Sequence, residues 1–193
     1  MRKRSIGLLL LLVLVLGGCG NSIQGVIAKK YPLKDTVQSS ANSGDAAKVY
    51  LAKGQSISQV AQFLRQQKQP KKASGVKNGK AVLVYDNNFV TLTKNKKNPD
   101  STDIEVASYT FVRDNYRPSF FNGLLTGYFL SSLFNVPDWG ARQSYRCQSA
   151  LNPCYGGYRH SGGHYKGPRR PPSFRGSLSG PGFFRGGGPN VGK

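Results

Sequence analysis

Apolar residues recur at helical spacing in two places in the first half of the chain, and each place predicts an α-helix. The first helix can be capped by Ser22 or by Asn21 and ends before Pro32; its apolar positions are Ile23, Val26 and Ile27. The second begins after Ser56, which can form a capping box with Gln59, and it ends before Pro70. The apolar face of this second helix is formed by Ile57, Val60, Ala61 and Leu64.

Short runs rich in β-branched and aromatic residues predict strands. We expect them at residues 36–40, 48–52, 81–85, 89–93 and 103–109. The turn-forming residues 86–88 join the third and fourth runs into a hairpin. In the last run, Ile104 and Val106 alternate with Asp103 and Glu105. This alternation predicts a strand with one buried face, and it leaves the two acidic side chains in solvent.

The order helix, two strands, helix, three strands is typical of an α+β fold. We expect a small antiparallel sheet with helices on one face, formed by residues 19–117. The chain has 193 residues, which fits one domain with tails and excludes a large multidomain enzyme. Its 10 Phe and 10 Tyr residues argue against disorder throughout, whereas 24 Gly and 11 Pro indicate that some region is poorly packed.

The net charge of +20 indicates anionic partners, and nucleic acid, anionic lipid and acidic wall polymer all fit it. The N-terminus narrows this choice. Basic residues 2–4 precede the apolar residues 6–16, which is the layout of a secretory signal. The sequence Leu16-Gly17-Gly18-Cys19 then resembles the bacterial lipobox. That resemblance implies cleavage before Cys19 and attachment of a diacylglycerol with fatty acyl chains such as palmitate; an ordinary signal peptide with an incidental cysteine is the alternative.

Residues 1–18 are therefore expected to be a cleaved signal peptide, with Cys19 as the lipid attachment site. The mature protein is expected to be anchored on the extracytoplasmic face of the cell membrane. Cleavage takes three positive charges from the total of +20 and leaves +17, so the excess charge belongs to the mature protein. At that location we expect no nucleic-acid partner.

Residues 118–138 carry no charge before Asp138 and predict an apolar helix. Three placements remain open: packing against the protein's own sheet, lying in the membrane interface, or spanning the membrane. Gly123 and Gly127 form a G-x-x-x-G pattern, which allows close helix packing. The residues expected to contact a membrane or a protein partner are Phe120, Phe121, Gly123, Leu124, Gly127, Tyr128, Phe129, Leu133 and Phe134.

Residues 139–193 are rich in Gly, Pro and aromatic residues and contain no acidic residue, so we expect a disordered basic tail. Its arginines are candidate binding groups for phosphate-bearing anions, because the guanidinium group can bind phosphate with two parallel hydrogen bonds. These candidates are Arg159, Arg169, Arg170, Arg175 and Arg185. The alternative is a solubilising spacer with no specific partner.

Cys147 and Cys154 leave three possibilities open. In an oxidising compartment they can close a disulfide, because the lipid consumes Cys19 and the remaining cysteine count is even. They can also remain free thiols, or they can bind a metal together with His160 and His164. The cysteine spacing is wider than that of usual zinc sites, so we predict a possible disulfide and no metal site.

Several short motifs resemble an uncharacterised family of bacterial lipoproteins, classified as a domain of unknown function and found mainly in Firmicutes and actinobacteria. Besides the lipobox and the Gly-rich tail, these motifs are Tyr31-Pro32-Leu33 before Asp35, Val49-Tyr50, Val84-Tyr85-Asp86-Asn87, Asn115-Tyr116-Arg117-Pro118-Ser119-Phe120, and residues 123–130. The resemblance implies a location and an architecture but no activity.

No catalytic motif is present: the sequence lacks G-x-S-x-G, a P-loop and H-E-x-x-H, and its two histidines lie in the tail. We therefore predict a non-catalytic protein without a cofactor. Its basic surface and tail are expected to contact anionic lipid or cell-wall polymer. The alternative is an accessory subunit that docks on an integral membrane protein through residues 118–137.

Overall fold

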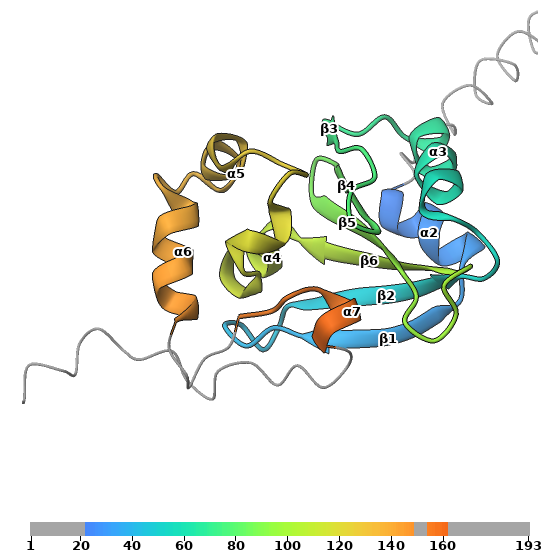
Figure 1. Cartoon of the computed structure of the whole chain (residues 1–193), viewed down its shortest axis with the longest axis horizontal. Helices are drawn as coiled ribbons and strands as arrows, with labels where there is room; N and C mark the ends of the chain where they lie inside the picture. Colours follow the sequence, from blue (N-terminus) through green and yellow to red (C-terminus); the bar gives the residue numbers. More distant parts are fainter. Residues whose placement is uncertain (1–21, 149–153, 162–193) are drawn as a thin grey trace, which may run out of the picture.

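The computed structural model describes residues 22–148 and 154–161. In chain order, its elements are α2 (Ile23–Lys30), β1 (Leu33–Gln38), β2 (Ala46–Ala52), α3 (Ile57–Gln67), β3 (Lys72–Ala73), β4 (Lys80–Val84), β5 (Asn88–Lys94), β6 (Thr102–Ser108), α4 (Tyr109–Asn115), the 3-10 helix η2 (Pro118–Phe121), α5 (Gly127–Phe134), α6 (Trp139–Cys147) and α7 (Tyr158–Ser161). The strands form one sheet in the order β1-β2-β6-β5-β4-β3, and every neighbouring pair is antiparallel (Figure 1). The predicted α+β class with an antiparallel sheet is confirmed.

Local signals set the first helices. The Ser56 hydroxyl accepts a hydrogen bond from the Gln59 backbone N–H at 3.3 Å, and the Ser56 N–H donates to Gln59 Oε1 at 2.8 Å. This is the predicted capping box, and α3 begins directly after it. At α2, the Ser22 hydroxyl accepts from the Gly25 N–H at 3.1 Å. The strand β3 was not predicted, because two residues are too short to show a pattern.

One face of the sheet packs against α2 and α3, as predicted. The core on this side combines the apolar faces of both helices with alternate residues of the central strands, including Leu83, Leu92 and Ile104. The two helices lie side by side over the sheet (Figure 1). Burial of these apolar faces supplies most of the stabilisation that short helices need.

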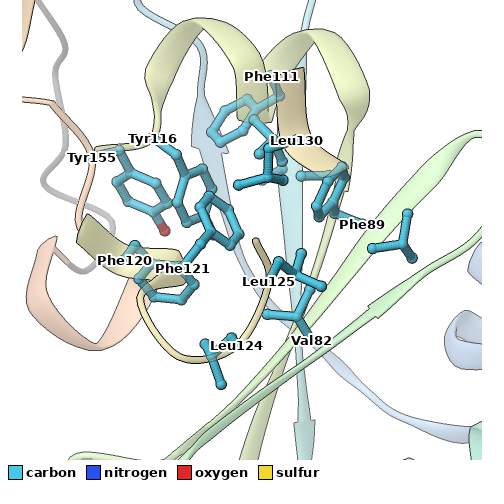
Figure 2. Close-up of a cluster of buried hydrophobic side chains, with 14 of the residues drawn as sticks. Val82, Phe89, Phe111, Tyr116, Phe120, Phe121, Leu124, Leu125, Leu130 and Tyr155 are labelled. Atoms are coloured by element: carbon cyan, nitrogen blue, oxygen red, sulfur yellow. The ribbon is translucent and has the colours of Figure 1, made fainter. Parts of the chain in front are cut away.

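The opposite face carries a second helical layer, whereas the sequence predicts helices on one face only. Phe89 of β5 and Phe111 of α4 pack there together with Phe121 of η2 and Leu130 of α5 (Figure 2). Side chains of β5 alternate between the two cores, so apolar residues are needed on both of its sides. The sheet is therefore the middle layer of three.

Residues 118–138 do not form one apolar helix, which corrects the prediction. The segment is divided into η2 and α5, and Gly123 lies in the turn between them at φ +73°. Gly127 is the first residue of α5, so the two glycines of the G-x-x-x-G pattern do not share a helix. Across residues 22–148 and 154–161, no helix combines the length and the apolar character that crossing a membrane requires.

The prediction of a disordered tail from residue 139 is wrong for residues 139–148 and 154–161. Trp139 opens α6 and is buried: its ring centroid lies 5.0 Å from that of Phe134, and its indole N–H donates to the Arg113 carbonyl at 2.9 Å. Tyr155 is buried against Tyr116. Average composition hides these few large aromatic residues, which suffice to join the segment to the core. Residues 162–193 lie outside the described part of the chain.

Candidate anion-binding cleft

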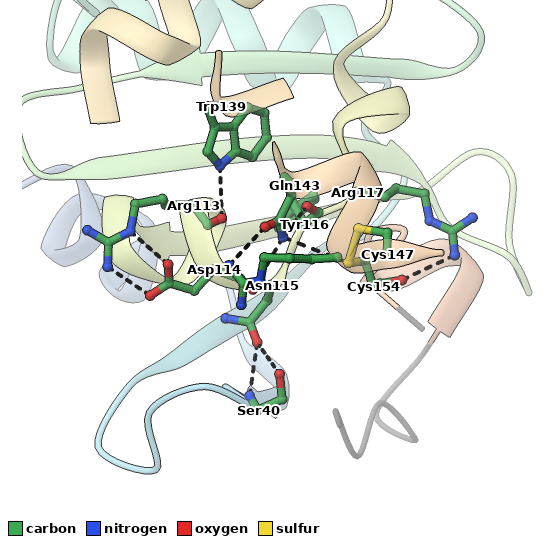
Figure 3. Close-up of a disulfide and its surroundings, with 11 residues drawn as sticks. Ser40, Arg113, Asp114, Asn115, Tyr116, Arg117, Trp139, Gln143, Cys147 and Cys154 are labelled. Atoms are coloured by element: carbon green, nitrogen blue, oxygen red, sulfur yellow. Dashed lines mark hydrogen bonds and ion pairs between the residues drawn. A yellow bond between two sulfur atoms is a disulfide. The ribbon is translucent and has the colours of Figure 1, made fainter. Parts of the chain in front are cut away.

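A disulfide fixes the segment that builds the site. Cys147, at the end of α6, is bonded to Cys154 (Figure 3). Residues 154–161, which we call the strap, continue from this bond and end in α7. The Tyr155 N–H donates to the Asn115 carbonyl at 2.8 Å, and the Arg117 N–H donates to the Tyr155 carbonyl at 2.9 Å. The disulfide and these bonds hold the start of the strap against the end of α4.

Glycine lets the strap turn onto the sheet. Gly157 adopts a φ of +86°, and a methyl group added there would lie 2.6 Å from the Phe120 ring. Both the backbone angle and the close approach of the ring therefore require glycine. Beyond this turn, α7 lies over the polar half of the sheet face whose other half packs against α4, α5 and α6.

Three acidic side chains lie beneath the strap. The Tyr158 hydroxyl donates to Asp35 Oδ2 at 2.9 Å. Asp103 Oδ1 accepts from Lys34 Nζ and from Asn95 Nδ2, both at 2.8 Å. Asp103 and Glu105 are each only 2% exposed, so the expectation that they lie in solvent is wrong. The strap, which is distant in sequence, covers them.

Glu105 is the most unusual of the three. It lies on the central strand β6, between Val49 of β2 and Thr91 of β5. Burial raises the pKa of its carboxyl to about 7, although the hydroxyls of Tyr116 and Tyr155 lower it by favouring the charged form. Its Oε2 accepts from the Tyr158 N–H at 3.3 Å, while Oε1 has no well-aligned hydrogen-bond partner in the described part of the chain.

The same burial affects the surrounding phenols. The pKa values of Tyr116 and Tyr155 are raised, first by burial and then by the charge of Glu105. These hydroxyls therefore keep their protons and can act as donors toward the carboxylate. The Glu105 carboxyl therefore exchanges its proton near neutral pH. Because the side chain is buried, it is not accessible to a substrate.

A cleft of about 860 Å³ lies beside the strap. It is bounded by the start of β1, the end of β2, the loop between β5 and β6, and α7. Its basic residues outnumber its acidic ones five to two: Lys34, Lys53, Lys96, Lys97 and Arg159 against Asp35 and Asp103.

The charges in this cleft are unequally neutralised. Asp103 is paired with Lys34, whose ammonium group also lies 4.7 Å from the centre of the Tyr158 ring. The other four cations, Lys53, Lys96, Lys97 and Arg159, are exposed and form no ion pair with any residue of the described ranges. A concave surface with unpaired cations concentrates positive potential, so the cleft is suited to anions.

The comparisons with known proteins place this fold in a family. A family model described as a domain of unknown function, DUF4247, matches residues 11–192. The chain belongs to the DUF4247 family. No curated protein and no solved structure matches the chain. The match includes every described residue, so the sheet, the strap and the cleft are all parts of the DUF4247 domain.

In this DUF4247 domain, most residues predicted to contact a membrane or partner are part of the core instead. Phe120, Phe121, Leu124 and Phe134 are buried, and Phe129 and Leu133 pack against them. Gly123 lies at the turn, where a methyl group would meet the Lys77 side chain, and Gly127 lies at the start of α5, where a methyl group would have no neighbour within 4 Å among the described residues. Tyr128 differs, because 87% of its surface is exposed.

Of the predicted anion-binding arginines, Arg159 lines the cleft. Cys19 and the arginines at 169, 170, 175 and 185 lie outside the described residues. The sequence pattern did not predict Lys53, Lys96 and Lys97 as site residues. The lysine-rich composition of the loop after residue 93 is a signal for Lys96 and Lys97 alone. No group of three or more His, Cys, Asp or Glu side chains able to hold a metal exists among the residues the structure describes.

Proposed function

We propose that this DUF4247 protein is a lipid-anchored extracytoplasmic protein that binds anionic groups, without catalysis, in the basic cleft. The ligand belongs to an anionic lipid or to a cell-wall polymer. The observation that carries this proposal is the set of four exposed cations without ion-pair partners in the described structure, gathered in one concave site. An anion can bind these cations directly, because it does not have to displace an acidic side chain from them first.

The proposed location is supported by three features. The basic and apolar N-terminal residues and the lipobox-like sequence at residues 16–19 have the order of a lipoprotein signal. The Cys147–Cys154 disulfide fits an oxidising compartment. The core begins at Ile23, four positions after Cys19, so a linker of at most about 14 Å separates the anchor from the fold.

Replacing Cys19 tests the anchor. We expect the wild-type chain in the membrane fraction of producing cells and Cys19→Ala in the soluble extracytoplasmic fraction or as uncleaved precursor, because no thioether can form. Fractionation followed by mass determination of the N-terminal peptide measures both outcomes. A wild-type protein whose N-terminal residue is an unmodified Cys19 would contradict the proposal.

Charge removal in the cleft tests the binding function. The probes for the mature chain are phosphatidylglycerol vesicles and long-chain inorganic polyphosphate, each titrated at low and at physiological salt. We expect binding to at least one probe, weakened by added salt because screening acts over about 8 Å at physiological ionic strength. Lys96→Gln/Lys97→Gln should reduce affinity about thirtyfold, since each of the two cations contributes about 1 kcal/mol near an anionic surface.

The matched control for this experiment is Lys29→Gln. Lys29 is an exposed lysine of α2, on the side of the sheet opposite the cleft. The Lys29→Gln substitution should leave binding through the cleft unchanged. Binding that is insensitive to salt, or equal losses for the control and the cleft variant, would refute the assignment of anion binding to the cleft.

A further inference from the structure

A second cavity lies next to the cleft and shares part of its wall. It has a volume of about 400 Å³ and is lined by Asn78, Lys80, Thr93, Phe120, Arg159 and His160. Arg159 and His160 of α7 line both cavities. The two cavities are therefore neighbours that meet at α7, and no acidic residue lines the second one.

Like charges converge around the second cavity. A methyl group added to Gly79 would lie 3.4 Å from Arg159 Nη1 and 3.7 Å from the Lys94 side chain, so both cations approach the same turn. Lys80 donates to the Phe120 carbonyl at 3.2 Å and lies 4.5 Å from the centre of its ring. Burial lowers the pKa of Lys80, as expected for a cation without an acidic partner.

The two cavities together form a basic track. From the first cavity to the second, its residues are Lys53, Lys96, Lys97, Arg159, Lys94 and Lys80. None of these six forms an ion pair within residues 22–148 and 154–161. Repulsion among them is relieved by an anion that reaches several at once, and a single phosphate cannot occupy both cavities.

The position of the track argues against a bilayer as its ligand. Five of its six cations line the two cavities, which a flexible chain can enter and a flat bilayer cannot; Lys94 lies beside them at the Gly79 turn. In addition, α2 packs on one face of the sheet, whereas the strap and the track lie on the other. Because the proposed anchor is joined to α2 by a short linker, it brings the α2 side toward the membrane and leaves the track on the far side of the sheet.

We propose that the basic track binds a linear polyanion with repeated phosphate groups, which passes over Arg159 from one cavity into the other. This inference rests on the proposed function and names its ligand class. The planar guanidinium group of Arg159 can bind two phosphate oxygens at once, so it is the central contact. The lysines on both sides bind the flanking phosphates.

The experiment compares orthophosphate, tripolyphosphate and long-chain polyphosphate at equal total phosphate, with phosphatidylglycerol vesicles as the lipid arm. We expect affinity per phosphate to rise with chain length and to exceed the affinity for vesicles. Arg159→Gln should weaken binding of the long chain about tenfold, since hydrogen bonds to charged groups are lost. Lys29→Gln is the matched control and should leave binding of all three phosphate probes unchanged; thermal unfolding verifies that each variant is folded.

A second variant tests passage across both cavities. Lys53→Gln/Lys94→Gln removes one cation on each side of Arg159, so it should weaken long-chain binding more than tripolyphosphate binding. Affinity that does not depend on chain length, or an unchanged affinity of Arg159→Gln, overturns the inference. Binding to vesicles alone also overturns it but leaves the proposed function standing, whereas binding to neither probe refutes both.

Discussion

Trp139→Ala should lower the free energy of unfolding by about 3–5 kcal/mol, the range for truncating a large buried aromatic residue. The indole is 2% exposed, contacts the rings of Phe121 and Phe134, and donates its N–H to the Arg113 carbonyl. Truncation therefore leaves a cavity and an unpaired carbonyl in the core. Denaturant unfolding followed by circular dichroism measures the loss.

Tyr145→Ala is the matched control for this prediction. Tyr145 lies on the same helix, α6, but 75% of its surface is exposed. We expect a change below about 0.5 kcal/mol, as for most surface substitutions. Equal, small effects of both substitutions would show that α6 does not belong to the cooperative unit.

Glu105→Gln should raise the free energy of unfolding at alkaline pH. It should also remove the part of the pH dependence of stability that Glu105 causes. The folded-state pKa of Glu105 is raised from 4.5 to about 7, chiefly by burial, so folding favours the protonated carboxyl. Its stabilising contribution is present below about pH 4.5 and is lost as the pH rises through 7. The pKa difference corresponds to about 3 kcal/mol, which the wild type loses over this range and the glutamine variant keeps.

Unfolding curves at pH 4.5, 6 and 8 for both proteins test this prediction. The informative quantity is the difference in unfolding free energy between wild type and variant at each pH, because the contributions of the other titrating groups cancel in this difference. Gln38→Ala removes a non-ionisable side chain from the exposed side of β1 and serves as the control; because no titrating group is lost, its difference in unfolding free energy from the wild type should stay constant with pH. A constant difference for Glu105→Gln as well would mean that Glu105 is ionised throughout or reached by solvent.

Both predictions concern residues for which the local sequence pattern was misleading. The alternation of Asp103 and Glu105 with Ile104 and Val106 is that of a strand with one wet face, and the strand itself was predicted correctly. The burial of its acidic side depends on Tyr158, more than 50 residues further along the chain. No pattern within β6 contains that information.

The local sequence pattern was also misleading for residues 118–148. The uncharged, apolar composition of residues 118–137 predicts a helix, and the Gly and Pro content of residues 139–193 as a whole predicts a disordered tail that begins at Trp139. The structure instead depends on individual aromatic residues: the rings of Phe121 and Phe134 both pack against Trp139 in the core. An apolar segment gains more from covering the apolar side of its own sheet than from remaining exposed, and only the fold shows that this side exists.

Several properties of this DUF4247 protein could be derived from the sequence alone: the α+β class, the helices α2 and α3, the β4–β5 hairpin and the overall positive charge. Each depends on neighbours within a few residues, such as a cap, a turn or a periodic apolar face, or on composition. The tertiary structure alone decided the second helical layer, the buried Glu105 and the meeting of Arg159 with the lysines of distant strands and loops. These features depend on which segments pack across the sheet, and that choice follows from the shape and apolar surface of the whole fold rather than from any local spacing.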